Sequence, residues 1–145
     1  MSSDSRKGSG RGLGAKPAPR AFTVEQANRS LPLVRRILRD VVTQYRLVER
    51  IQKRRGRLAC QGRLDELKAV EARGMEAARR LSDLLSELAS IGCEVRDYQR
   101  GCVDFPAMRN GREVYLCWKL SEDAVAFWHE RHAGEVGRRP IHCES

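Results

Sequence analysis

The sequence predicts an α+β protein in which a long antiparallel helical hairpin packs against a three-stranded antiparallel β-meander. Three observations predict this fold class. Apolar residues recur at steps of three and four as far as Ile91, which is the spacing of an α-helix. From Cys93 onward they alternate in steps of two, which is the spacing of a strand. Within that alternating part lies Asn110-Gly111, a strong signal for a tight β-hairpin.

The 145 residues suit one domain preceded by a leader. Residues 1–21 are rich in Gly, Ser, Pro and basic side chains and lack the apolar segment of a secretory signal, so they predict a disordered basic leader. Residues 22–145 are expected to form the domain, divided into the helical hairpin at 22–92, the meander at 93–132 and a C-terminal tail at 133–145. No stretch approaches the roughly 20 apolar residues that cross a bilayer. We therefore expect a cytoplasmic protein without membrane contact.

"FTVEQA" predicts the start of the first helix. The hydroxyl of Thr23 can cap the helix while Gln26 reaches back to the capping residue, which is a capping box. Pro32 lacks an amide hydrogen and predicts a break or kink, with Ser30 capping the restarted helix. The segment that follows has one apolar stripe, formed by Leu38, Val41, Tyr45 and Val48.

"RRGRLACQGR", with Gly56 and Gly62, predicts the turn between the two helices. Gly92 predicts the end of the second helix. The small residues Gly74 and Ala77 predict a close approach of the helices midway. The seam has coiled-coil spacing, and it packs either within the hairpin or against a second subunit in a homodimer. Its residues are Val70, Gly74, Ala77, Leu81, Leu84, Leu88 and Ile91.

The β-rich segments "CVDF", "REVYLCWKL" and "AVAFWHE" predict the three strands. A two-residue loop at Asn110-Gly111 fixes the pairing of the first two, because hairpin register follows from turn length. The resulting pairs are Arg109 with Arg112, Phe105 with Leu116, and Asp104 with Cys117. A loop at Glu122-Asp123 would then pair Phe127 with Trp118 and His129 with Leu116.

That pairing places His129 at the end of an apolar face, where a core histidine with one hydrogen-bond partner and a ligand are the two interpretations. A turn one residue longer would shift the pairing and change the neighbours of His129. Residues three apart in a strand point to opposite sides, so His129 and His132 of "FWHERHAG" would not bind one ion; in a helix they would converge. The metalloprotease pattern H-E-x-x-H is absent at these histidines. The expected face carries Val103, Phe105, Val114, Leu116, Trp118 and Phe127.

The cysteines are odd in number and form no C-x-x-C pair, so they predict reduced thiols rather than a disulfide framework or a structural zinc site. Cys117, within an apolar run, is the best example of an expected buried thiol. The five are Cys60, Cys93, Cys102, Cys117 and Cys143.

The net charge of +9 comes mainly from two segments, the leader and the first helix, and residues 1–20 hold five Lys and Arg against one Asp. Residues 24–58 hold ten Lys and Arg against three Asp and Glu, whereas residues 64–91 hold four against six. The distribution fits either an anionic partner or two antiparallel helices with complementary faces, and such exposed pairs add little stability.

The segments "FTVEQANRSLP", "VDFPAMRNGREVYLCWKL", "FWHE" and "GRRPI" resemble the family named domain of unknown function 2203, from about Phe22 to Ile141. The resemblance implies a small soluble bacterial protein with helices before strands, and it supplies no activity. Two positions depart from the family pattern: His132 stands where a carboxylate is frequent, and Glu135 where an aromatic is frequent. The matching positions are Asp104, Phe105, Pro106, Gly111, Arg112, Glu113, Trp118, Trp128, His129, Gly137, Arg139 and Pro140.

The first functional hypothesis is a non-enzymatic module that binds a small molecule or a metal at the sheet edge. His129 and Asp104 are the candidate ligands of a divalent cation, and Glu113 could supply a further oxygen. Arg112 and Arg139 are the candidate clamps for an anion.

The second hypothesis is an RNA-binding or ribosome-associated protein that uses the basic hairpin, and the third is a protein-interaction module that dimerises through the seam. Neither a glycine-rich phosphate loop nor a nucleophile elbow is present, so an enzyme has the least support. The candidate nucleic-acid contacts are Lys53, Arg54, Arg55 and Arg57.

Overall fold

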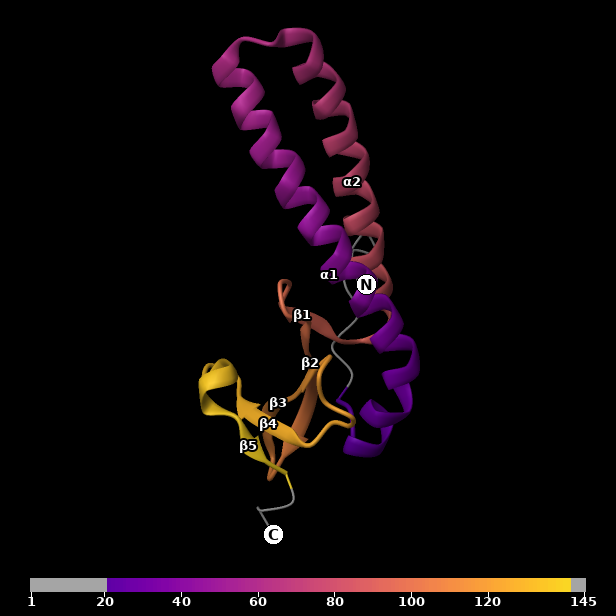
Figure 1. The fold of residues 1–145 in the computed structure, drawn as a ribbon. Helices are drawn as coiled ribbons and strands as arrows, with labels where there is room; N and C mark the ends of the chain where they lie inside the picture. The colour runs from indigo at the N-terminus through magenta and orange to yellow at the C-terminus, as the bar shows by residue number, and fades with distance from the viewer. Residues whose placement is uncertain (1–20, 142–145) are drawn as a thin grey trace, which may run out of the picture.

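The computed structural model describes residues 21–141 and shows two helices followed by an antiparallel sheet of five strands (Figure 1). The α+β class is therefore confirmed. The expected disorder of the leader falls on residues outside the described range, apart from Ala21, as does the end of the tail. No helix of residues 21–141 is both long and apolar enough to cross a membrane. The elements are α1 (Val24–Gln61), α2 (Leu64–Ile91), β1 (Glu94–Asp97), β2 (Cys102–Arg109), β3 (Arg112–Lys119), β4 (Phe127–Glu130), the short 3-10 helix η3 (Gly134–Gly137) and β5 (Arg139–Pro140).

The start of α1 is as predicted, but its continuity is not. Thr23 Oγ1 accepts a hydrogen bond from the amide of Gln26, and Gln26 Oε1 accepts one from the amide of Thr23, each at 3.0 Å. The predicted break at Pro32 is wrong, because α1 continues through it. Pro32 is exposed, and because it has no amide hydrogen the helix loses only the backbone hydrogen bond to the carbonyl one turn earlier. Buried side chains before and after Pro32 stabilise the helix. Ser30 donates to the carbonyl of Ala27 and caps no second helix.

The turn between the helices occupies only the end of the predicted turn region, residues 54–63. Gly56 is inside α1, and the helix ends at Gly62, whose φ of 67° lies in the left-handed region. The amides of Gly62 and Arg63 donate back to the carbonyls of Ala59 and Leu58, which satisfies the end of the helix. A helix tolerates a glycine at a modest cost, so Gly56 alone does not end it.

The seam of α2 packs within the chain, which is the first of the two predicted alternatives. Val70, Ala77, Leu84 and Leu88 are buried in the hairpin. A methyl group at Gly74 would lie 3.2 Å from Ile51 Cγ2, so the predicted close approach is present. The near half of the hairpin packs on the sheet, and the far half extends beyond it (Figure 1). That far half has a separate small core of Ile51, Leu58, Val70 and Ala77.

The β2–β3 hairpin has the predicted register. Its pairs include Arg109 with Arg112, Phe105 with Leu116, and Asp104 with Cys117. Asn110 and Gly111 have φ values of 52° and 77°, as a two-residue turn of this hand requires.

The predicted count of three strands is wrong, because β1 and β5 extend the sheet at its two edges. β1 has four residues with a register shift between Val95 and Asp97, and β5 has two residues in the segment expected to be the tail. Strands this short carry no alternating pattern long enough to recognise.

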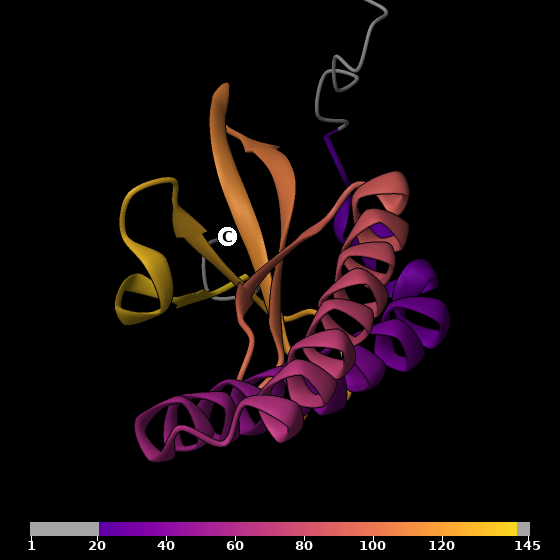
Figure 2. The same ribbon diagram turned by 90° about the horizontal axis from the view of Figure 1, so that it is seen from above.

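For the third meander strand, β4, the pairing expected from a loop at Glu122-Asp123 is wrong, and a pairing shifted by one residue, the alternative that a longer turn allowed, is present. Phe127 pairs with Cys117, Trp128 with Leu116, and His129 with Tyr115, one residue away from the expected pairing. The connection after β3 is longer than the two-residue loop, and a shift of one residue moves every side chain to the other face. Both helices lie on one side of the sheet (Figure 2), and it is Trp128, not His129, that packs toward them.

Candidate metal-binding site

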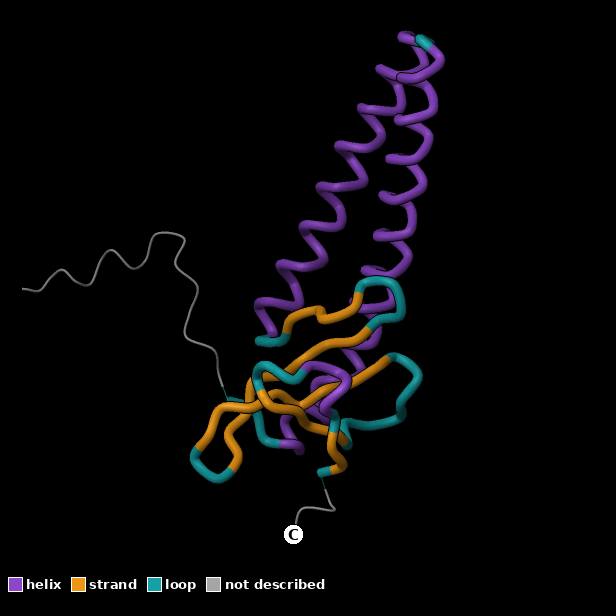
Figure 3. Tube along the Cα trace, turned by 90° about the vertical axis from the view of Figure 1, so that its left-hand side faces the viewer, coloured by secondary structure: helices purple, strands orange, loops and turns teal. Residues whose placement is uncertain are grey.

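The face of the sheet that points away from the helices carries a second buried group of side chains. Along β2 and β3, alternate residues such as Val103 and Trp118 pack on the helices. Their neighbours along the two strands point to the other face of the sheet. The strands of this sheet are orange in Figure 3. Four residues of this face are each at most 2% exposed, and we call them the far-face cluster: Cys102, Asp104, Cys117 and His129.

Asp104 is the centre of the cluster. Its Oδ2 accepts hydrogen bonds from Nε of Arg96 at 2.7 Å and from Nη2 of the same guanidinium. Its Oδ1 lies 3.1 Å from Nε2 of His129. Arg96 reaches it from the irregular part of β1, where the strand pairing shifts. A fully buried carboxylate is stable only when it is paired and hydrogen-bonded, so Arg96 and His129 fix both its charge and its orientation.

The hydrogen-bond partners of His129 determine where its protons lie. Nδ1 is 2.7 Å from the carbonyl oxygen of Glu130, which can only accept, so Nδ1 carries a proton. Nε2 faces the Asp104 carboxylate, so a second proton lies between these two atoms. The ring also contacts Tyr115, with centroids 5.6 Å apart. In this arrangement the Nε2 lone pair is not available to a metal ion.

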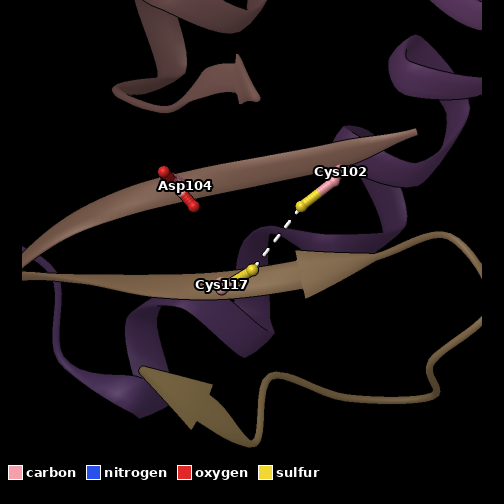
Figure 4. A group of neighbouring side chains, drawn as sticks. All are labelled: Cys102, Asp104 and Cys117. Atoms are coloured by element: carbon pink, nitrogen blue, oxygen red, sulfur yellow. Dashed lines mark hydrogen bonds between the residues drawn. The ribbon is translucent and has the colours of Figure 1, made fainter. Parts of the chain in front are cut away.

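The two thiols of the cluster lie in direct contact, with Cys102 Sγ and Cys117 Sγ 3.5 Å apart (Figure 4). The hydrogen bond from Cys102 lowers the pKa of Cys117 to about 7, an effect opposed by burial and aided by the charge of Arg138. The same hydrogen bond, together with burial, raises the pKa of Cys102. Cys117 is therefore the first of the pair to ionise. Cys93 differs, because burial raises its pKa to about 12.

The sulfurs and the carboxylate are close enough to share one ion. The two Sγ atoms and an oxygen of Asp104 all lie within 4.8 Å of one another, and the three side chains converge between β2 and β3 (Figure 4). Two sulfurs bound to one tetrahedral Zn²⁺ at about 2.3 Å would be roughly 3.8 Å apart. The observed 3.5 Å needs only a small adjustment to reach that geometry.

Arg138, in the segment between η3 and β5, lies close enough to the thiol pair for its charge to act on both thiols. Its Nη2 donates to the carbonyl of Cys117 at 3.2 Å and to Oε1 of Glu122 at 2.8 Å. Its guanidinium lies 4.1 Å from the centroid of the Phe127 ring. The same Glu122 oxygen accepts a hydrogen bond from the amide of Lys119. These contacts hold the C-terminal segment over the cluster.

Of the residues predicted to form a site, the structure brings together only Asp104 and His129. Arg112 forms an ion pair with Glu130 at 2.9 Å, and Glu113 forms one with Arg131 at 3.0 Å, both near the tip of the β2–β3 hairpin. Arg139 packs over the ring of Trp128, at 5.4 Å from its centroid. The expectation that these three side chains surround His129 therefore has no support in the geometry.

The two histidines do not meet. β4 ends at Glu130, and His132 is exposed in the turn that follows, whereas His129 is buried. Their separation was expected, although the strand does not continue to His132 as that expectation assumed.

Arg96, Cys102 and Cys117 were not predicted from the sequence as parts of a site. A signal for two of them was present, because the predicted pairing placed Asp104 opposite Cys117, and Cys102 is two residues before Asp104 on the same face. The two cysteines have no C-x-x-C spacing, because they come from neighbouring strands, so they were not recognised as a ligand pair. Cys143 lies outside the described residues.

The four basic residues predicted at the hairpin tip lie instead on the last turns of α1. Arg54 is 4.0 Å from a carboxylate oxygen of Glu66. Lys53, Arg55 and Arg57 are exposed.

Comparison with known proteins identifies a family for this chain. No curated protein and no solved structure matches the chain significantly. The family model described as uncharacterized conserved protein (DUF2203) matches residues 20–141, a range that contains both helices and the whole far-face cluster. The predicted resemblance is confirmed: the chain belongs to the DUF2203 family.

Proposed function

We propose that the protein is a non-enzymatic metal-binding module that holds a soft divalent cation, with Zn²⁺ as the type, between Cys102, Cys117 and Asp104. One observation carries the proposal. Two buried thiols lie 3.5 Å apart beside a fully buried carboxylate, although the two cysteines lie on different strands. Thiolate ligands favour Zn²⁺ and related soft ions over Mg²⁺ or Ca²⁺.

In this proposal the residues divide into ligands and supports. The two sulfurs and one oxygen of Asp104 bind the ion. Arg96 and His129 hold Asp104 in place, as hydrogen-bond partners of metal ligands commonly do. His129, predicted from the sequence as a ligand, becomes a positioning residue. Three protein ligands leave the fourth position of a tetrahedral ion for water or a small molecule, which is where a small ligand would bind.

Charge also favours the proposal. Loading the site with Zn²⁺ adds two positive charges, and loss of the two thiol protons removes two. The net charge of the buried cluster is then the same as with both thiols protonated, so loading leaves no uncompensated charge in the interior.

Equilibrium dialysis against Zn²⁺ under reducing conditions tests the proposal. The wild type should bind one ion per chain. Cys102→Ser and Cys117→Ser should each weaken binding by about 100-fold or more, since each removes a ligand. Cys93→Ser and Cys60→Ser are matched controls, one at a buried thiol and one at an exposed thiol outside the cluster, and they should bind as the wild type does.

Co²⁺ provides a measurement that does not depend on the folding of any variant. The wild type loaded with Co²⁺ should show thiolate-to-metal charge-transfer absorption and tetrahedral d–d bands. A wild type without these bands that also retains no Zn²⁺ on dialysis would refute the proposal, as would equal losses in the cluster variants and the controls.

Two alternatives from the sequence have less support. The seam residues, for which a homodimer was the alternative interpretation, pack within the hairpin. RNA binding through Lys53, Arg54, Arg55 and Arg57 stays a prediction, and Arg54 is already close to Glu66. A cytoplasmic location is part of the proposal, because a reducing compartment keeps a thiol pair available to a metal.

A further inference from the structure

The first helix carries a row of basic side chains, of which only two belong to the sequence run "QKRRGR". Its members follow one another at helical steps of three and four, with Thr43 in the single gap, so they share one face of α1. That face is separate from the buried positions of α1, such as Leu38 and Val41, and it borders the sheet at Arg46, which donates to the carbonyl of Gln99. All six side chains are exposed. We call this row the basic stripe; it consists of Arg36, Arg39, Arg46, Arg50, Lys53 and Arg57.

The charge of the basic stripe is not neutralised within the described part of the chain. None of the six forms an ion pair there, and Arg46 donates only to the backbone carbonyl of Gln99. Asp40 and Glu49 are the nearby acidic residues of α1, and neither is within ion-pair distance of the stripe. Several other arginines are paired, among them Arg63 with Glu66 and Arg79 with Glu76.

The basic stripe is long enough to contact an extended polyanion along its length. From Arg36 to Arg57 a straight helix rises by about 32 Å, which equals roughly nine base pairs of a duplex at about 3.4 Å each. Ile51 and Leu58, buried between α1 and α2, flank the end of this row on α1.

We propose that the basic stripe binds the phosphate backbone of a nucleic-acid duplex without reading its sequence. Five of the six cations are arginines, whose planar forks match phosphate oxygens. The stripe has no aromatic side chain on which unpaired bases could stack, which disfavours a single strand. The apolar face of α1 is buried, so the helix has no apolar side to insert into a lipid surface.

This interface differs from the one predicted at the hairpin tip. Lys53 and Arg57 belong to both sets. Arg54 lies close to Glu66, and Arg55 points to another side of the helix. The interface is independent of the metal site, because no residue of the stripe belongs to the far-face cluster.

Fluorescence anisotropy with short duplexes of RNA and of DNA, titrated at several salt concentrations, tests the proposal. With six phosphate contacts, the logarithm of the binding constant should fall against the logarithm of salt concentration with a slope of about −5 on B-DNA. The variant Arg39→Gln, Arg50→Gln, Arg57→Gln should reduce that slope to about −3 and weaken binding at low salt. The matched control Arg73→Gln, Arg79→Gln, Arg80→Gln removes the same charge from exposed positions of α2 and should leave the slope unchanged.

Far-UV circular dichroism of both variants checks that the helices are intact. Binding to either RNA or DNA duplexes with the expected difference between the variants supports the proposal, since the phosphate backbone is common to both. Equal slopes for the stripe variant and the control would overturn it. Tighter binding to single strands, or binding to vesicles of anionic lipid without binding to duplexes, would overturn it as well.

Discussion

At Asp104, a fully buried carboxylate is held by a guanidinium on one oxygen and by an imidazole on the other. The arrangement holds an oriented carboxyl group in the interior, directly beside two thiols. An unpaired charge at this position would be costly, and Arg96 and His129 remove that cost. The outcome is an oriented oxygen ligand next to a sulfur pair, which is what the proposed metal site needs.

The thiol pair makes the proposed Zn²⁺ affinity depend on pH. Below the Cys117 pKa of about 7 both thiols are protonated, so each bound ion displaces two protons. Above it only Cys102, whose pKa is raised, still has a proton to lose. The affinity should therefore fall as the pH falls, by about 100-fold per pH unit below pH 7 and by about tenfold per unit just above it. Competition with a chromophoric chelator measures this; an affinity that is constant from pH 6 to 8 contradicts it.

The residue scale also shows what the sequence could and could not predict. Asp104 and His129 were predicted to share a site because both are polar residues in apolar strands. The sulfurs were assigned to packing, because thiols on separate strands leave no spacing signature in the chain. Arg96 reaches Asp104 from a strand of four residues that the sequence pattern did not reveal.

Among the elements, α1 shows how position decides the effect of a glycine. Gly56 is inside the helix with no atom within 4 Å of where a methyl group would lie, and Gly62 ends the helix at a φ of 67°. Gly56→Ala should therefore stabilise the protein by roughly 0.5–1 kcal/mol. Gly62→Ala should destabilise it by about 1 kcal/mol, because an L side chain is strained there. Urea denaturation measures both, and a destabilising Gly56→Ala would contradict the placement of the turn at Gly62.

The strands differ in how far local sequence determines them. The β2–β3 register was predictable because Asn110-Gly111 sets a two-residue turn by itself. The β3–β4 register was not, because no residue pair in "LSEDA" dictates the loop length. There the packing of Trp128 against the helices determines the outcome, and the shift of one residue brings His129 to Asp104.

The whole molecule has two cores of unequal size along the helical hairpin. The main core joins the near half of the hairpin to the sheet, whereas the far half has only the small group around Ile51 and Leu58. Local unfolding should therefore begin in the far half. In hydrogen exchange, amides of residues 50–70 should exchange faster than those of residues 31–42 by about tenfold or more. Equal protection along the whole of α1 would show that the hairpin unfolds as one unit instead.

The same division separates the two proposed activities in space. The far-face cluster is part of the sheet, and the basic stripe runs along α1 from the near half into the far half. The sequence predicted the helical hairpin and the sheet as classes of structure, because their periodicities are local. The meeting of β2, β3 and β4 at one cluster is a product of tertiary pairing.

X-ray absorption spectroscopy of the protein loaded with one equivalent of Zn²⁺ tests the central claim most directly, because it identifies the ligand atoms themselves. Two sulfur neighbours at about 2.3 Å, together with lighter oxygen or nitrogen neighbours at about 2.0–2.2 Å, are expected for an ion held by Cys102, Cys117 and Asp104. A first shell made of nitrogen and oxygen alone, with no sulfur, would contradict the assignment.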